Sequence, residues 1–448
     1  MKKRDRVRRA WRKHRKPELH KLFKKLRNRV QSLIRDAKEN YYRTVCSLKR
    51  DTVSTWGELR RLGLVSSSSG KDRCNFDLDE LNAAFVLSSS VGSDIESGDL
   101  NWDPDALDVK CFDDTCFFFA DISPKALRDA IFKGRSEAMG IDKISTKCLK
   151  IAFPVLLPYL LKLFNFLLQN SRYPELWKLA LIRPLPKVKS PISVTDFRPI
   201  SLLCTLSKAL ERIVFDQIVD YLETNNLFDN YQSAYRKGYS TQTAVLRVTD
   251  DMRRAIDERM VTVLVLFYFS KVFDRVCHGK LLNKLRKLNF SKSAILWFIN
   301  YLEGRKQAVY DTDGRISAWR DSKHGVPQGS VLGPLLFSLY LYDFNKTINQ
   351  CKYSYYADDL LIYLHCPPDE IDEGIITVNN EIEVIRSWAE SNSLLLNDSK
   401  TKAMVVGSAR YLNAVSLGNV NNILVGNNIV PYSTSIKYLG IIITNTLD

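Results

Sequence analysis

Histidine is scarce and cysteine is unpatterned in this sequence of 448 residues. There are five histidines and nine cysteines, with no Cys-x-x-Cys pair and no spacing typical of a set of metal ligands. These absences exclude a zinc knuckle and a disulfide framework, and they fit a reducing compartment.

Long apolar runs are equally few. The basic N-terminus has no apolar run behind it, so we expect no secretory signal. The most apolar long stretch, residues 151–168, contains Pro154, Pro158 and Lys162, and we interpret it as a core helix rather than a membrane span. With 45% hydrophobic and 26% charged residues, the composition is that of a globular protein, and it excludes a wholly disordered or collagen-like chain.

Excess charge is absent from most of the chain. The formal net charge is +16, and residues 1–50 alone hold 20 basic against 4 acidic side chains, so the remaining residues are neutral in sum. This basic arm predicts a polyanionic partner, nucleic acid before a membrane surface. The simpler alternative is a solvated basic helix.

Residues 20–46 of the arm have helical periodicity. Apolar side chains recur at steps of three or four from Leu22 to Val45, which predicts one apolar stripe. The basic side chains lie on the other faces: Lys24, Lys25, Arg27 and Arg29. We expect this helix to pack on a body by its stripe and to present these cations to nucleic-acid phosphates.

The remainder of the chain predicts an α+β body. Helices are expected at 155–169, 206–222, 241–257 and 375–392, a buried central strand at 261–269, a hairpin at 306–320, two short strands around an acidic turn at 353–364, and further strands near 403–406 and 437–443. Strands separated by long helices are typical of an α+β fold. Residues 63–118 have weak periodicity, which predicts a linker or an N-terminal extension.

The sharpest chemical feature is the pair Asp358-Asp359 between two apolar arms. Adjacent carboxylates beside a core are costly unless they have a partner. Two Mg²⁺ ions, which prefer carboxylate and phosphate oxygens, would supply one and could activate a 3′-hydroxyl. The simpler alternative is a solvated acidic turn. The surrounding motifs are needed to distinguish a metal site from such a turn.

Those motifs resemble the reverse transcriptases of non-LTR (LINE-type) retrotransposons, in particular the jockey-like insect elements. The resemblance covers about 120–443, and its motifs occur in the family's order: RPISLL within 177–214, QSAYRKGYST at 232–241, FSKVFDRVCHGKLL at 269–282, GVPQGSVLGPLLF at 325–337, YADD at 356–359, SWAESNSLLLNDSKTK at 387–402 and KYLGIIIT at 437–444. The resemblance implies a right-hand polymerase with fingers, palm and a truncated thumb, preceded by a basic helical N-terminal arm.

The resemblance also implies roles for individual residues. Asp358 and Asp359 match the palm carboxylates that hold two Mg²⁺ ions, with Mn²⁺ as a substitute, and Lys400 matches a lysine proposed to protonate the leaving pyrophosphate. The positions that match the nucleotide site are Lys187 and Arg198, facing the triphosphate, Phe273 as the gate against ribose, and Gln328 and Gly329 in the loop at the incoming nucleotide. Tyr438, Leu439 and Gly440 match the primer grip. Each of these residues also has a simpler interpretation that needs no nucleotide: Phe273 as a core residue, the glycines as residues that shape a turn, and the cations as ordinary surface residues.

One position departs from the family's pattern. The family has LDFSKAFD in the first palm strand, whereas this chain has LFYFSKVFD at 266–274, so the position of the family's first metal-binding Asp, which would be the third carboxylate beside Asp358 and Asp359, holds Tyr268. A phenol ionises near pH 10 and is a poor Mg²⁺ ligand at neutral pH. Asp274 belongs to the family's own pattern and lies too far along the chain to replace it. We therefore expect polymerisation to fall by several orders of magnitude.

These observations divide the chain into four segments: a basic helical arm (1–62), a linker or extension (63–118), fingers and palm (119–405), and the primer grip with the start of a truncated thumb (406–448). We interpret the sequence as a fragment of a larger element protein and, given Tyr268, as a decayed copy. An intact parent reading frame with Asp at 268 would contradict that interpretation.

The implied function is RNA-directed DNA polymerase, a nucleotidyl transfer from a dNTP to a primer 3′-hydroxyl. The implied partners are template RNA, a DNA primer or target site and dNTPs, with no membrane and no signal for an oligomeric state. A catalytically dead nucleic-acid-binding remnant of the same fold is the alternative. The basic run at 2–9 is a weak nuclear signal, so we expect a ribonucleoprotein of nucleus and cytoplasm.

Overall fold

The computed structural model describes residues 2–47, 76–90 and 116–447, apart from 135, 189, 237, 312 and 416–419. The predicted segments 48–62 of the arm, and 63–75 and 91–115 of the linker or extension, lie outside the described residues. The four-segment division of the chain therefore remains a prediction.

The body is built on two four-stranded sheets. One sheet has the order β6-β7-β3-β8, formed by Lys352–Tyr356, Asp359–Cys366, Val261–Tyr268 and Lys402–Val406. All of its neighbouring strands run antiparallel. The other sheet has the order β2-β1-β4-β5, formed by Phe197–Leu202, Leu179–Pro186, Lys306–Val309 and Arg320–Asp321.

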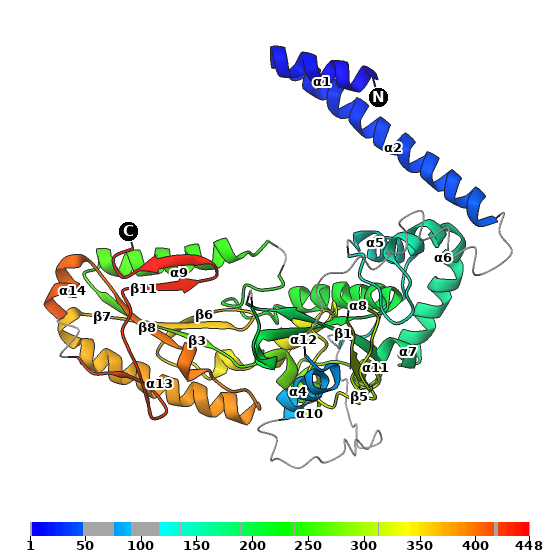
Figure 1. Cartoon of the computed structure of the whole chain (residues 1–448). Helices are drawn as coiled ribbons and strands as arrows, with labels where there is room; N and C mark the ends of the chain where they lie inside the picture. Colours follow the sequence, from blue (N-terminus) through cyan, green and yellow to red (C-terminus); the bar gives the residue numbers. More distant parts are fainter. Residues whose placement is uncertain are drawn as a thin grey trace.

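The first sheet is covered on both faces, which explains the continuous apolar run of β3. Val263, Val265 and Phe267 point to the larger core, with helices α10 (His278–Lys287), α12 (Gly333–Tyr340) and α13 (Ile371–Ser391). Leu264 and Leu266 point to the opposite face, against α9 (Thr241–Asp257) and the hairpin β11–β12. In Figure 1, α13 lies below this sheet and α9 with β11 above it. Because side chains alternate along a strand, Tyr268 shares the α9 face.

Besides the strands of the second sheet, the body contains helices whose buried side chains belong to the larger core: α5 (Pro124–Lys133), α6 (Thr146–Gln169), α7 (Glu175–Lys178), α8 (Thr205–Thr224) and α11 (Lys292–Leu302). Part of the segment predicted as a linker or extension is also a helix, α4 (Leu78–Ser90), which packs on this sheet. Fully buried Asn82 fixes it there by donating to Ser317 Oγ and Ala318 O. Leu78, Leu81 and Phe85 also bury a short apolar stripe against the sheet, a signal that the sequence analysis missed.

Helix α6 is longer than the predicted 155–169. It begins at Thr146 because Ser145 caps its N-terminus by accepting from Cys148 N, and both Pro154 and Pro158 lie within it. Among the described helices, α6 alone is long and apolar enough to cross a membrane, by length and composition only. Leu149, Leu160 and Phe164 are buried in the body, whereas Val155 and Tyr159 are exposed. Since 28% of the apolar window is buried, the interpretation as a core helix stays a prediction.

The predicted helices 206–222, 241–257 and 375–392 and the strands at 261–269 and 353–364 are confirmed as α8, α9, α13, β3 and β6–β7. The expected hairpin at 306–320 is β4–β5, which pair antiparallel. The strand predicted near 437–443 is instead a hairpin, β11 (Ser435–Tyr438) with β12 (Ile441–Thr444), because Leu439 and Gly440 turn the chain with φ of +47° and +89°.

Shorter elements complete the body. They are the 3₁₀ turns η1 (Val194–Asp196), η2 (Val272–Arg275), η3 (Phe344–Lys346), η4 (Pro368–Glu370) and η5 (Asp398–Lys400), helix α14 (Ala409–Val415), and the hairpin β9 (Ile423–Val425) with β10 (Asn428–Val430). Cys116 is disulfide-bonded, whereas Cys204, Cys277, Cys351 and Cys366 are free cysteines.

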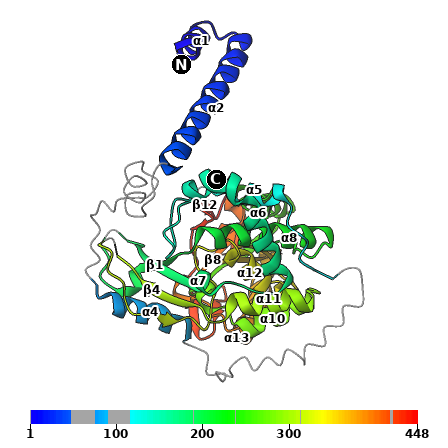
Figure 2. The same cartoon turned by 90° about the vertical axis from the view of Figure 1, so that its right-hand side faces the viewer.

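The basic arm forms a helical hairpin, α1 (Lys2–His14) and α2 (Pro17–Ser47). Trp11 of α1 stacks on His20 and Phe23 of α2, at centroid distances of 4.4 and 5.9 Å. Figures 1 and 2 show the hairpin standing apart from the body. Among the described side chains of the apolar stripe, Leu22 and Leu33 are exposed, so this part of α2 does not pack on the body as predicted. The side chains at 41–47 lie outside the described ones, and for them the packing remains a prediction.

Candidate active site

The acidic pair lies on a tight turn between β6 and β7. Tyr356 pairs with Asp359, which leaves Ala357 and Asp358 as a two-residue turn with Ala357 at a φ of +57°. Burial, followed by the charge of Asp358, raises the pKa of Asp359 to about 6. Asp359 therefore resists ionisation until a positive charge is placed beside it.

Tyr268 lies directly opposite Asp359 in the register of β3 and β7. Side chains at such positions start about 5 Å apart, so the phenol occupies the place where a third carboxylate would meet the acidic pair. Burial, Asp359 and Asp358 all raise the pKa of Tyr268, which keeps the phenol neutral. Its hydroxyl donates to Lys437 O at 3.4 Å, on the strand that leads to the predicted primer grip.

Asp358 and Asp359 are the two carboxylates of this turn. In the part of the chain that the structure describes, no three His, Cys, Asp or Glu side chains are grouped so that they could hold a metal ion. Asp358 and Asp359 can offer carboxylate oxygens to a divalent cation, but Tyr268 adds only a neutral phenol oxygen beside them.

The loop that contains Gln328 and Gly329 is held from two sides. Ser201 N of β2 donates to Gln328 O at 2.7 Å, and the Gln328 side chain donates to Asp274 Oδ1 at 2.8 Å. Gly329 has a φ of +122°, and a Cβ there would lie 2.6 Å from Ser201 O, so the close approach to β2 requires glycine. Burial raises the pKa of Asp274 to about 6.

A buried glutamate on α8 fixes the other end of this loop. Glu211 is fully buried and accepts from Val331 N at 2.7 Å and from Leu332 N at 3.2 Å, just before α12. The Tyr173 hydroxyl donates to its second oxygen. Sequence reasoning missed both Glu211 and the Asp274–Gln328 bond, since the partners are 54 to 121 positions apart along the chain.

Phe273 lies in η2 and is half-buried, with its ring 5.1 Å from that of Phe337. Its carbonyl accepts from Val326 N at 2.8 Å, which ties η2 to the start of the Gln328 loop. The predicted gate and the predicted nucleotide loop are thus parts of one hydrogen-bonded unit.

Four cations meet beside this unit. Lys187 follows β1 and donates to Thr195 O at 2.8 Å. Burial lowers its pKa, and the nearby charges of Lys271, Arg198 and Lys400 lower it further. The structure therefore brings together the three predicted cations and adds Lys271, which the sequence analysis missed although it lies within the FSKVFD motif. Clustered cations that lack enough counter-charge are suited to binding an anion such as a triphosphate.

Lys400 reaches this cluster from η5. Asn397 caps η5 by accepting from Lys400 N, and its own N–H donates to Tyr268 O at 2.7 Å. The end of β3 therefore positions Lys400 through one backbone hydrogen bond.

The predicted primer grip is the β11–β12 hairpin. Tyr438 is fully buried, and its hydroxyl donates to Ser354 Oγ of β6 at 3.2 Å. A second segment approaches the acidic turn from the other edge: Ser233 N donates to Tyr355 O. Burial, Asp358 and Tyr356 raise the pKa of nearby Tyr235 to about 12. The QSAYRKGYST motif carried no residue role in the sequence analysis, and this proximity to Asp358 is its structural counterpart.

The arm residues Lys24, Lys25, Arg27 and Arg29 are exposed on α2 and are not brought to the acidic turn. All other predicted site residues surround it or the Gln328 loop.

Comparison with known proteins identifies this arrangement. Residues 185–443 match the family model described as reverse transcriptase (RNA-dependent DNA polymerase). The chain belongs to the reverse transcriptase family. The predicted α+β right-hand polymerase fold is confirmed with it.

Curated relatives agree with the motif-based resemblance. The chain is 32% identical to the probable RNA-directed DNA polymerase from transposon BS of Drosophila melanogaster, over 58% of this chain and 29% of that protein. It is 26% identical to the RNA-directed DNA polymerase from mobile element jockey of Drosophila funebris, over 69% of this chain and 34% of that protein. It is 27% identical to the probable RNA-directed DNA polymerase from transposon X-element of Drosophila melanogaster, over 70% of this chain and 34% of that protein. The chain thus spans about a third of the length of these relatives, and the predicted resemblance to LINE-type reverse transcriptases is confirmed.

Among solved structures, the chain is similar to apo telomerase from Candida Tropicalis truncated from its C-terminal domain. The TM-score is 0.42 and the identity 14%, over 61% of this chain and 54% of that one.

Proposed function

We propose that this chain is the polymerase body of an RNA-directed DNA polymerase that binds its substrates but transfers nucleotides poorly. The observation that carries the proposal is the pairing of Tyr268 with Asp359 across β3 and β7. The fold is that of a polymerase, and the cation cluster and the nucleotide loop fit one. The acidic turn, however, has two carboxylates where the family's pattern has three.

Reverse transcriptases use divalent metals. In this chain we assign Asp358 and Asp359 as the remaining ligands for Mg²⁺ or Mn²⁺. Tyr268 supports weak cation binding only, because a neutral phenol does not offset the repulsion between two dications. Since the pKa of Asp359 is about 6, acidification below that value weakens cation binding further.

The substrates follow from the surrounding groups. We assign Lys187, Arg198, Lys271 and Lys400 to the dNTP triphosphate, and Phe273, Gln328 and Gly329 to the sugar and base of the nucleotide. The β11–β12 turn with Tyr438, Leu439 and Gly440 would hold a DNA primer or target strand paired to template RNA. The exposed cations of α2 would add salt-dependent contacts to nucleic-acid phosphates.

A second candidate function is nucleic-acid binding alone, without chemistry. The same tyrosine favours it, since the cations assigned to phosphate (Lys187, Arg198, Lys271, Lys400 and those of α2) do not need a third carboxylate. Either function would place the protein in a ribonucleoprotein of nucleus and cytoplasm.

One paired experiment separates these functions from an unrelated basic protein. We expect the purified chain to bind a primer annealed to template RNA with an affinity that falls steeply with salt. We expect little or no primer extension when dNTPs and Mg²⁺ or Mn²⁺ are added. Salt-insensitive binding would contradict both functions, and efficient extension would contradict the assigned role of Tyr268.

A further inference from the structure

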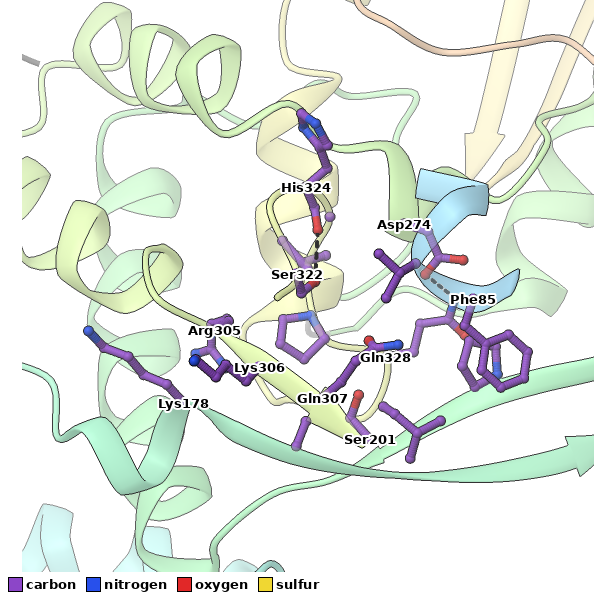
Figure 3. Close-up of a pocket in the computed structure, with 17 residues that line it drawn as sticks. Phe85, Lys178, Ser201, Asp274, Arg305, Lys306, Gln307, Ser322, His324 and Gln328 are labelled. Carbon is purple, nitrogen blue, oxygen red and sulfur yellow. Dashed lines mark hydrogen bonds between the residues drawn. The ribbon is translucent and has the colours of Figure 1, made fainter. Parts of the chain in front are cut away.

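The side chain of Gln328 borders a cavity. The cavity has a volume of about 50 Å³, and Phe85 of α4 and Asp274 of η2 also line it. Figure 3 shows Phe85, Asp274 and Gln328 around this space. Since one water molecule needs roughly 10–15 Å³, the cavity has room for a few waters, and on that side no packed atoms hold Gln328. The position of its amide group therefore depends on hydrogen bonds.

Asp274 supplies the hydrogen bond that orients this amide. Its Oδ1 accepts from Gln328 Nε2 at 2.8 Å. An ionised carboxylate has acceptors only, so it binds the amide nitrogen of Gln328 and turns the amide oxygen away from itself. The backbone bond from Ser201 N to Gln328 O fixes where the residue lies, whereas Asp274 determines which way its side chain faces.

Further contacts lock η2 to the start of the same loop. Gly325 N donates to Val276 O at 2.8 Å, and His278 Nε2 lies 2.8 Å from Gly325 O. Burial lowers the pKa of His278 to about 4, so the ring is neutral and donates its Nε2–H to that carbonyl. A Cβ on Gly325 would lie 2.8 Å from the carbonyl oxygens of Phe273 and Asp274, so this close approach requires glycine.

The Asp274 carboxylate is retained at a cost to stability. Burial raises its pKa to about 6, and the hydrogen bond from Gln328 and the charges of Lys271 and Lys187 offset this only in part. A buried carboxylate is costly for the fold, and ionisable groups with such shifts are concentrated at functional sites. The fold therefore has little need of this charge, which favours a role for it at the nucleotide site.

We propose that Asp274 is a positioning residue that sets the preference for deoxyribonucleotides over ribonucleotides by orienting Gln328 relative to Phe273. This inference rests on the proposed function, which assigns Phe273 and Gln328 to the sugar and base of the nucleotide. The Phe273 ring is backed by Phe337 at 5.1 Å, so the Gln328 loop is the partner that can move. A ring excludes a 2′-hydroxyl only while the nucleotide is held against it, because contact energies change steeply within an ångström.

The readout that isolates this role is the ratio of the affinities for dATP and ATP. The two ligands differ only in the 2′-hydroxyl. Asp274 also faces Lys271 and Lys187, so removing its charge changes the binding of both triphosphates alike. A loss of overall stability also affects both alike. A changed ratio therefore reports the fit between the ring of Phe273 and the loop of Gln328.

The test is equilibrium binding of dATP and ATP, with Mg²⁺, to the full chain on a primer annealed to template RNA. The primer ends in a dideoxynucleotide and the next template base is U, so no nucleotide is transferred. We expect the unmodified chain to prefer dATP and Asp274→Ala to reduce this preference by about tenfold, the effect of losing one hydrogen bond to a charged group. Asp274→Asn should restore most of it, because its amide oxygen can accept from Gln328 Nε2.

Asp343→Ala is the matched control. It also removes a carboxylate of the body that binds a buried lysine, since Asp343 Oδ1 lies 2.8 Å from Lys284 Nζ, but it lies outside the Gln328 loop. It should lower Tm and leave the ratio unchanged. Gln328→Ala removes the same bond from its half-exposed side and should reduce the ratio as Asp274→Ala does. In the Gln328→Ala chain, Asp274→Ala should have no further effect, because Asp274 acts through Gln328.

Two kinds of failure are distinguishable. A preference for dATP that survives Asp274→Ala and Gln328→Ala would overturn the inference and leave the proposed nucleotide site standing. An equal change in Asp343→Ala, or a full effect of Asp274→Ala in the Gln328→Ala chain, would do the same. An unmodified chain that binds neither nucleotide, or binds both equally, would overturn the proposed nucleotide site and the inference with it.

Discussion

Tyr268→Asp adds a carboxylate directly opposite Asp359 and beside Asp358. Two unit charges 4 Å apart interact by about 4 kcal/mol at an effective dielectric constant near 20, so a dication gains about 8 kcal/mol from the new carboxylate as an upper figure. If solvent screening leaves half of this, cation affinity rises by about 4 kcal/mol, or roughly a thousandfold. We expect primer extension with Mg²⁺ or Mn²⁺ to rise by at least a similar factor.

Tyr268→Asn is the matched control, since it removes the same ring without adding charge. Primer extension on an RNA template and thermal unfolding with and without cation are measured for both variants and the unmodified chain. Without cation, the Asp variant should melt below the Asn variant because three carboxylates repel one another. Added cation should reverse this order, whereas it should barely shift the Asn variant.

Three results would refute parts of this reasoning. Equal extension by the unmodified chain and Tyr268→Asp would mean that the third carboxylate is dispensable. Rescue by Tyr268→Asn would mean that ring bulk, rather than missing charge, blocks the site. A Tyr268→Asp variant whose Tm ignores cations would show that Asp358 and Asp359 do not form a cation site at all.

Three further outcomes follow from the structure. Burial raises the pKa of Asp274 from 3.8 to about 6, so the stability that its neutral form contributes is fully present below about pH 4 and is lost as the pH rises through 6. The unmodified chain should therefore lose up to about 3 kcal/mol more stability between pH 4 and pH 7.5 than Asp274→Asn, which has no such group. Urea unfolding at both pH values measures the difference. Glu211→Gln should lower the free energy of unfolding by about 1–3 kcal/mol, and Tm with it, because an amide cannot accept from all of the donors that Glu211 binds. The control Glu223→Gln changes an exposed residue of the same helix and should leave Tm unchanged. Replacing Lys24, Lys25, Arg27 and Arg29 by Gln should reduce the slope of log affinity against log salt by up to about 3, with Tm unchanged; an unaltered slope would remove α2 from the nucleic-acid interface.

The sequence predicts those parts of the fold whose signal is local. The bounds of α9 coincide with the predicted 241–257, because Ser240 caps the helix and an apolar stripe runs along it. The run 261–269 predicts β3, since a strand covered on both faces is apolar at every position. The same alignment of motifs places Tyr268 at the palm's first carboxylate, and the β3–β7 register sets it opposite Asp359.

Other parts depend on contacts between distant segments, which a local pattern does not contain. Helix α4 is held in part by Asn82, whose partners lie more than 200 positions away. Glu211 looks like an ordinary charged residue of an amphipathic helix, yet it is fully buried and caps the loop before α12. Lys271 sits within a recognised motif, but its role beside Lys187 is visible only once β1 and η2 are adjacent.

The tyrosine at 268 suits its place in the fold. It ends a strand, where aromatic side chains are favoured, and its ring packs partly buried against the cluster that contains Leu266 and Tyr438. It also leaves the neighbouring Asp359, whose carboxyl already resists ionisation, without a second like charge. Folding is therefore compatible with a tyrosine here, whereas the proposed metal site would gain from a carboxylate. Arg198 lies on β2 and Lys400 on η5, while Lys187 and Lys271 lie next to β1 and η2, so the placement of these cations does not depend on a carboxylate at position 268. On the proposed function, Tyr268 therefore lowers nucleotide transfer while the cations that would bind phosphate stay in place.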